Sequence, residues 1–122
     1  TDFSIACGPF RDNPRRDVAK YVFDAFRAKG FMTGAYFSKP DWHHHGFWNP
    51  YYATPNRHPN YRRDMHPDWW KSYVDYTKGQ IREITDGRFG PLDILWLDGG
   101  WITGDEVGLN EVLPEARRVS RR

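Results

Sequence analysis

The 122-residue sequence has one cysteine, Cys7, and no long apolar run. A single cysteine excludes a disulfide within the chain and a metal site built from several thiolates. No run approaches the roughly 18 apolar residues of a membrane-spanning helix, so no membrane span is expected. The net charge is only +2, and the basic residues are spread along the chain without forming a stripe. Nucleic acid is therefore not an expected partner.

Several common enzyme motifs are also missing. The sequence has no Gly-x-Gly-x-x-Gly pattern, no P-loop and no serine nucleophile elbow. The short run Asp98-Gly99-Gly100 lacks the later glycine and the Lys-Ser/Thr pair that cradle a phosphate. These absences argue against a nucleotide-binding protein, and no cofactor is expected.

Aromatic residues, by contrast, are abundant. They make up 17% of the chain, with six Trp, seven Tyr and eight Phe. One interpretation is a core built from rings. The other is a cleft for a sugar or an apolar ligand, because flat rings stack on the C–H faces of pyranoses much as they pack on one another.

The most informative segment is the apolar run 94–97, which ends in Asp98, Gly99 and Gly100. Consecutive apolar residues predict a strand buried on both faces, as in parallel sheets covered by helices. Asp98 then lies at the carboxyl end of that strand, where α/β folds bind ligands and project catalytic groups. The alternative is that Asp98 caps the next helix or belongs to an Asp-Gly turn, and the local pattern does not separate the two.

The remaining elements follow from hydrophobic spacing. Three- and four-residue periodicity predicts helices over 17–29, 67–85 and 109–119, and a second strand is expected over 31–38. A short strand at Phe3 and Ile5 is also possible. The region 39–66 is too long for an ordinary connection and is interpreted as an elaborated loop after a strand.

This order predicts two neighbouring parallel strands with helices on one side. Two strands do not make a complete sheet, and alone they would expose a large apolar area. We therefore expect a single α/β unit without an internal domain boundary. It is expected to belong to a larger β/α barrel or to assemble with other copies.

Two groups of side chains invite a chemical interpretation. Tyr36 is near the end of the first strand and would lie level with Trp96 and Asp98 if the strands are neighbours. The alternative for Tyr36 is a core ring whose hydroxyl reaches the rim. A histidine-rich group follows, comprising His43, His44 and His45, with His58 and His66 further on. Adjacent histidines on an extended loop point apart, so no metal site is expected.

Several segments resemble the α-L-fucosidases of glycoside hydrolase family 29. Residues 34–44, Gly-Ala-Tyr-Phe-Ser-Lys-Pro-Asp-Trp-His-His, are similar to the family segment Gly-x-Tyr-Tyr/His-Ser followed by Asp/Glu-Trp. Residues 90–99, Gly-Pro-Leu-Asp-Ile-Leu-Trp-Leu-Asp-Gly, resemble the strand that carries the nucleophile. Residues 73–83 resemble the helix before it, and residues 1–3 resemble a Thr-Asp-Tyr that follows the second strand.

The resemblance implies a (β/α)8 TIM-like barrel that hydrolyses α-L-fucosides with retention, acting on a fucosylated glycan or oligosaccharide. Asp98 matches the nucleophile, and Tyr36 and Trp96 match positions that contact the fucose ring. His43 and His44 match a loop near the mouth of the site. Family members are often exported, which favours a secreted or periplasmic location.

The chain also departs from the family pattern. The paired-histidine motif His-His-Asp-Gly-Phe would precede Thr1, and the acid/base carboxylate and a sugar-binding arginine would follow Arg122. The expectation is an internal fragment that covers strands 3 and 4 with helices 2 to 4, inactive without the rest of the barrel. The alternatives are a non-catalytic carbohydrate-binding or structural α/β module and, less favoured, a metal-dependent hydrolase that uses the histidine loop.

Overall fold

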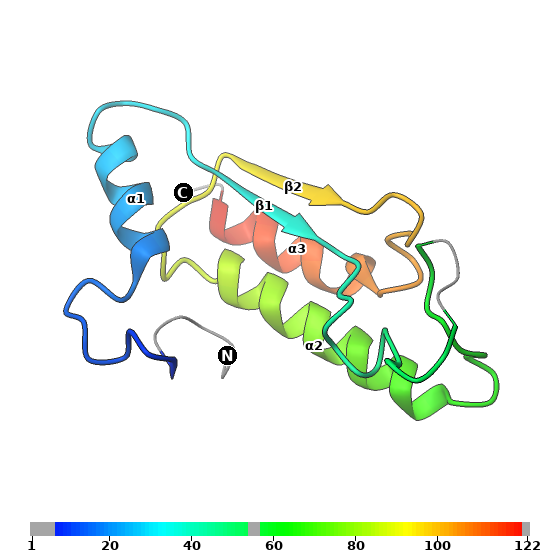
Figure 1. The fold of residues 1–122 in the computed structure, drawn as a ribbon. Helices are drawn as coiled ribbons and strands as arrows, with labels where there is room; N and C mark the ends of the chain where they lie inside the picture. Colours follow the sequence, from blue (N-terminus) through cyan, green and yellow to red (C-terminus); the bar gives the residue numbers. More distant parts are fainter. Residues whose placement is uncertain (1–6, 54–56, 121–122) are drawn as a thin grey trace.

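The computed structural model describes residues 7–53 and 57–120 as a mixed α/β structure. Its elements in chain order are α1 (Val18–Arg27), β1 (Gly34–Ser38), α2 (Pro67–Thr85), β2 (Ile94–Asp98) and α3 (Leu109–Ser120). Figure 1 shows α2 and α3 side by side along one face of the strands, with α1 near the strands' amino-terminal ends. None of the described helices is long and apolar enough to cross a membrane.

The two strands form a parallel sheet in continuous register. Gly34 pairs with Ile94 at one end and Ser38 pairs with Asp98 at the other, so both strands finish at the same level. A helix connects them, as parallel neighbours require. The α/β class and the parallel pairing predicted from the sequence are therefore confirmed. A complete barrel needs more strands than the two described here.

The faces of this sheet differ sharply in exposure. On the helix side Ala35 is buried, and Leu95 and Leu97 pack against the core. On the other side Tyr36 is 62% exposed and Trp96 is 66% exposed. The prediction that residues 94–97 are buried on both faces is wrong for the described structure. Its helices cover a single face, and no described element covers the side that we call the open face.

The core lies between the sheet, α2 and α3. Its fully or nearly fully buried members are Phe47, Tyr73, Ile81, Ile102, Val107, Leu109 and Val112. Each large apolar side chain of this kind contributes roughly 1.5–3 kcal/mol relative to an exposed position. Phe47 joins this core from the long loop, so packing fixes part of that loop against α2.

Capping residues explain where the first helix ends. Asp17, predicted as the first residue of the helix, is its N-cap, and its side chain accepts from the N–H of Lys20. At the other end Gly30 adopts a φ of +79°, and its N–H donates to the carbonyl of Arg27 at 2.9 Å. The N–H of Phe31 donates to the carbonyl of Phe26 at 3.1 Å, and their rings pack edge to face. The helix therefore ends at Arg27, two residues before the predicted end at residue 29, and Gly30 closes the turn that follows it.

The second helix has the predicted bounds. It begins at Pro67, whose missing N–H is no loss in a first turn, and Asp68 follows in that turn. Its end at Thr85 is followed by Asp86 and by Gly87, which adopts a φ of +93°. α3 begins at Leu109 as predicted and extends through Ser120.

The first strand is shorter than expected. It starts at Gly34 and not at residue 31, because the N–H of Thr33 donates to the side chain of Asp93 at 2.7 Å instead of joining the strand ladder. The described residues of the region 39–66 form turns and bends without a helix or strand, as predicted. The possible strand at Phe3 and Ile5 and the resemblance of residues 1–3 fall outside the described residues.

Candidate active site

Asp98 ends β2 and is held by two hydrogen bonds. The hydroxyl of Tyr36 donates to Oδ2 of Asp98 at 2.5 Å, and the N–H of Gly99 donates to Oδ1 at 2.7 Å. In the parallel register Tyr36 pairs with Trp96 at the middle of the sheet, two residues before the pair of Ser38 with Asp98 at its carboxyl end. The structure therefore joins the phenol and the carboxylate, as expected for neighbouring strands. The next helix begins eleven residues later at Leu109, so Asp98 is not its N-cap.

These contacts keep Asp98 ionised. The Tyr36 hydroxyl, then the Gly99 N–H, lowers the pKa of Asp98 below its usual value, and the nearby Lys39 charge acts in the same direction. Desolvation opposes them only in part. The reciprocal effect raises the pKa of Tyr36, because a hydroxyl that donates to a carboxylate resists losing its proton. Asp98 is therefore a carboxylate near neutral pH.

Lys39 is a part of the site that the sequence interpretation missed. It is only 5% exposed, and its ammonium donates to the main-chain carbonyl of Asp98 at 2.7 Å. Its own carbonyl accepts a hydrogen bond from the Tyr73 hydroxyl of α2 at 2.6 Å. Burial lowers the pKa of Lys39, and the charge of Asp98 counteracts this. The one available signal was its position directly after Ser38, the residue of β1 that pairs with Asp98.

The two strand ends also touch through Gly99 and Pro40. Gly99 adopts a φ of +77°, and a Cβ added there would lie 2.2 Å from Cδ of Pro40. Only glycine adopts this positive φ readily and also leaves room for Pro40, because it has no Cβ. Gly99 therefore allows a close approach of the two strand ends, whereas a Cβ at Gly100 would meet nothing within 4 Å.

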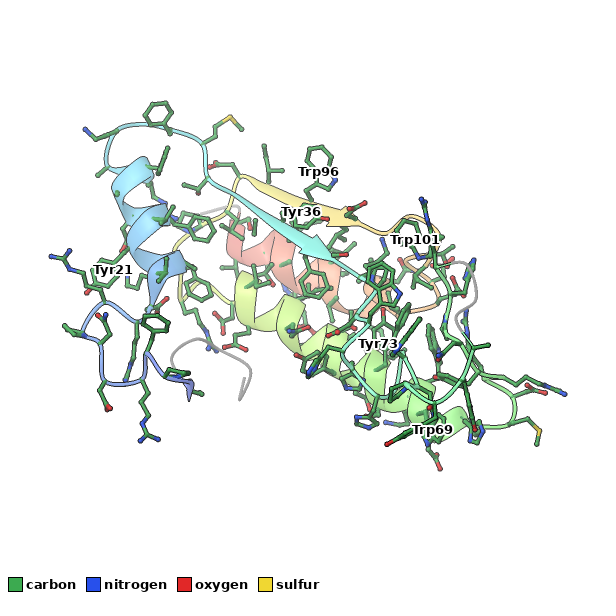
Figure 2. All side chains as sticks on the ribbon, in the orientation of Figure 1. Tyr21, Tyr36, Trp69, Tyr73, Trp96 and Trp101 are labelled. Carbon is green, nitrogen blue, oxygen red and sulfur yellow. The ribbon has the colours of Figure 1, made fainter. Side chains whose placement is uncertain are left out.

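The open face brings together three of the predicted site residues, Tyr36, Trp96 and Asp98. Figure 2 shows Tyr36 and Trp96 on the side of the strands away from the helices, with Trp101 beyond the end of β2. Tyr36, Trp96 and Asp98 together present a phenol, an indole and a carboxylate. Such a surface can orient a sugar hydroxyl, pack on an apolar ring face and supply a negative charge.

The loop histidines have different surroundings. The His44 side chain is buried, its Nδ1 accepts from the N–H of Gly46 at 3.0 Å, and its ring lies 4.7 Å from that of Tyr76 in α2. It also stacks on His45, and burial lowers the pKa of His44. His43 is exposed in the same loop. The structure thus packs His44 against α2, and the substrate-binding role of His43 and His44 stays a prediction.

A metal centre and an enclosed cavity are the other kinds of site that residues 7–53 and 57–120 could form. No group of three or more His, Cys, Asp or Glu side chains is placed there to hold a metal ion. A cavity of about 300 Å³ lies on the helix side of the sheet, and its lining includes Leu95, Leu97 and Leu113. Asp98 is not among the residues that line it, so the cavity is separate from the carboxylate site.

Comparison with known proteins gives one match. A family model described as Alpha-L-fucosidase matches residues 6–120, a range that contains all five elements and Asp98. No curated protein and no solved structure matches the chain at a significant level. The family match covers nearly the whole sequence and agrees with the segments singled out around Tyr36 and Asp98. The chain therefore belongs to the α-L-fucosidase family.

Proposed function

We propose that this chain contributes the nucleophile side of a retaining α-L-fucosidase site, with Asp98 as the nucleophile. The observation that carries the proposal is the position of Asp98. It is an ionised carboxylate at the end of a parallel strand, and the hydroxyl of Tyr36 and the N–H of Gly99 orient it. Membership of the family supports glycoside hydrolysis in general.

The first chemical step would form a covalent intermediate. A carboxylate oxygen of Asp98 attacks the anomeric carbon of an α-L-fucoside while the glycosidic C–O bond breaks. The leaving-group oxygen takes a proton from a general acid. In the second step water attacks the same carbon, gives its proton to the conjugate base of that acid, and releases Asp98 as a carboxylate.

The general acid is assigned to residues outside 7–53 and 57–120. In a retaining site the two carboxyl groups lie about 5–5.5 Å apart, and the negative charge of one raises the pKa of the other. Among the described residues, the groups that act on the pKa of Asp98 are Tyr36, Gly99 and Lys39, and none of these three carries a carboxyl group. This supports placing the general acid elsewhere in the protein.

The open face would provide the walls of the sugar pocket. Tyr36 and Trp96 are paired in register on that face, so they can contact one ring together. The indole suits the apolar methyl group of fucose, and the phenol suits a hydroxyl or the nucleophile itself. In the family-level (β/α)8 barrel, with β1 and β2 as strands 3 and 4, this face would line the interior and its mouth.

The test is covalent labelling of the full-length protein with 2-fluoro-fucosyl fluoride. Peptide mass spectrometry should find the fucosyl adduct on Asp98, and Asp98→Asn should remove it. Asp93→Asn is the matched control, because Asp93 lies at the opposite end of β2 and binds the main chain of Thr33. That variant should still be labelled. Labelling of another residue with Asp98 unmodified would reject the assignment.

A further inference from the structure

A pair of tryptophans lies just beyond the two strand ends. Trp42 follows β1 by four residues and Trp101 follows Asp98 by three. Their rings are stacked, with centroids 6.5 Å apart and an interplanar angle of 29°. Figure 2 shows Trp101 past the carboxyl end of β2, further out than Trp96. The pair therefore extends the site from Asp98 along the strand direction.

The protein fixes this pair from both sides. Pro40 packs against Gly99, and each tryptophan lies two residues after one member of that contact. The buried Phe47 touches Trp42 edge to face at 6.4 Å between ring centroids. These contacts pre-organise Trp42, which lowers the entropy lost when a ligand binds it.

Arg57 adds a charge to the same cluster. Its guanidinium carbon lies 5.1 Å from the ring centroid of Trp101, within the range of a cation–π contact. Arg57 has a φ of +68°, a left-handed conformation that residues other than glycine rarely adopt. The indole Nε1 of Trp101 is buried and has no hydrogen-bond acceptor among the described residues. Ring contacts, not an indole hydrogen bond, therefore hold Trp101.

Exposure separates the roles of the two rings. Trp42 is 48% exposed, whereas Trp101 is more enclosed. Trp42 thus has a surface that a ligand can reach, while Trp101 supports it from behind. A flat indole is suited to the C–H face of a pyranose, and the arginine beside it is suited to sugar hydroxyls.

We propose that Trp42, backed by Trp101 and flanked by Arg57, binds the sugar residue on the leaving-group side of the scissile bond. This rests on the proposed function and deepens it. Tyr36 and Trp96 occupy the open face and serve the fucose ring, whereas Trp42 lies beyond Asp98, toward the loops. A terminal fucose lies deepest in such a site, so the rest of the oligosaccharide passes outward over Trp42.

The test compares two substrates of the full-length protein. Fucosyl fluoride has a one-atom leaving group that cannot reach Trp42, whereas a fucosyllactose has a disaccharide that can. The fucosyllactose isomer that the wild type hydrolyses with the highest kcat/KM is used, and its kcat/KM is divided by the kcat/KM of fucosyl fluoride. Trp42→Ala should lower this ratio about tenfold, which corresponds to the loss of one aromatic stacking contact. Trp42→Phe should restore most of the ratio, and Trp42→Leu, which lacks a flat ring, should not.

Tyr51→Ala provides the matched control. Tyr51 is an aromatic residue of the same loop and is 91% exposed. Its replacement should leave the substrate ratio unchanged. Equal losses on both substrates for Trp42→Ala and Trp42→Leu, or no loss on either, would overturn the proposal while leaving fucoside hydrolysis intact. Failure of the wild type to hydrolyse the fluoride would instead reject the proposed function, and this proposal with it.

Discussion

Replacing Gly99 by alanine should weaken the junction between the two strand ends. Gly99 adopts a φ of +77°, and a new Cβ would lie 2.2 Å from Cδ of Pro40. The left-handed backbone costs an alanine about 1–2 kcal/mol. Relieving the overlap adds about 1–3 kcal/mol, typical of an overpacked position. The sum is a loss of about 2–5 kcal/mol in the free energy of unfolding.

Gly100→Ala is the matched control for this substitution. A Cβ at Gly100 meets nothing within 4 Å, and its φ is not in the left-handed region. The control should therefore change stability by less than about 0.5 kcal/mol, as an ordinary surface substitution does. Both variants would be compared with the wild type by urea denaturation, followed by circular dichroism.

The same substitution should also affect chemistry. A methyl group at position 99 would overlap Pro40, so the backbone there has to shift. The N–H of the same residue donates a hydrogen bond to the carboxylate of Asp98, so the shift should disturb that carboxylate. Labelling of Asp98 by 2-fluoro-fucosyl fluoride should therefore be slower in Gly99→Ala than in Gly100→Ala. Equal stability and equal labelling rates for the two variants would refute the claim that the Pro40 contact positions the carboxylate.

Three further predictions concern groups around the site. Tyr36→Phe removes the main hydrogen-bond donor to Asp98 and should raise the pKa of Asp98, so that the acidic limb of the pH–labelling profile moves to higher pH. An acidic limb at the same pH would contradict the claim that the Tyr36 hydroxyl lowers the pKa of Asp98. Tyr73→Phe leaves the carbonyl of Lys39 without its 2.6 Å donor and should cost about 1–3 kcal/mol in urea denaturation; a cost near zero would show that the bond does not hold the strand end. Burial depresses the pKa of His44, so the unfolded chain binds its proton more readily. The stability due to His44 should be complete above about pH 6.5 and fall at lower pH, and His44→Gln should flatten this decline; an equal decline in both proteins would assign it to other groups.

Local signals predicted most of the elements. α2 has the expected bounds because Pro67 and Gly87 act through the backbone at its ends, whatever the rest of the chain does. For α1 the signal was less exact, because the helix ends at Arg27 and Gly30 closes the turn after it. The parallel pairing followed from the order of elements, since a helix connection brings consecutive strands side by side in one direction.

Burial and long-range contacts were harder to predict. The run around Trp96 indicated a strand, but its composition does not say whether a second layer covers the other face. The exposed Val22 of α1 shows the same limit, because its apolar stripe predicted the helix correctly without predicting what covers it. For the site residues, too, the sequence predicted those whose place in a strand was clear and missed the one in a loop. Tyr36 was found from its level in the strand, whereas Lys39 lies just past the end of β1, where the alternation of strand faces no longer predicts where a side chain points.

The register of the two strands also limits which insertions and deletions the chain can tolerate. Side chains alternate between faces, so Tyr36 and Asp98 share the open face only while each strand keeps its phase. Losing one residue just before Ile94 would turn Asp98 toward α2 and α3 and bring leucines to the open side. A length change in the loop after Ser38 leaves that phase untouched. Insertions and deletions should therefore accumulate in the loops after the strands. There they can change the surroundings of the Asp98 carboxylate without moving it to the other face of the sheet.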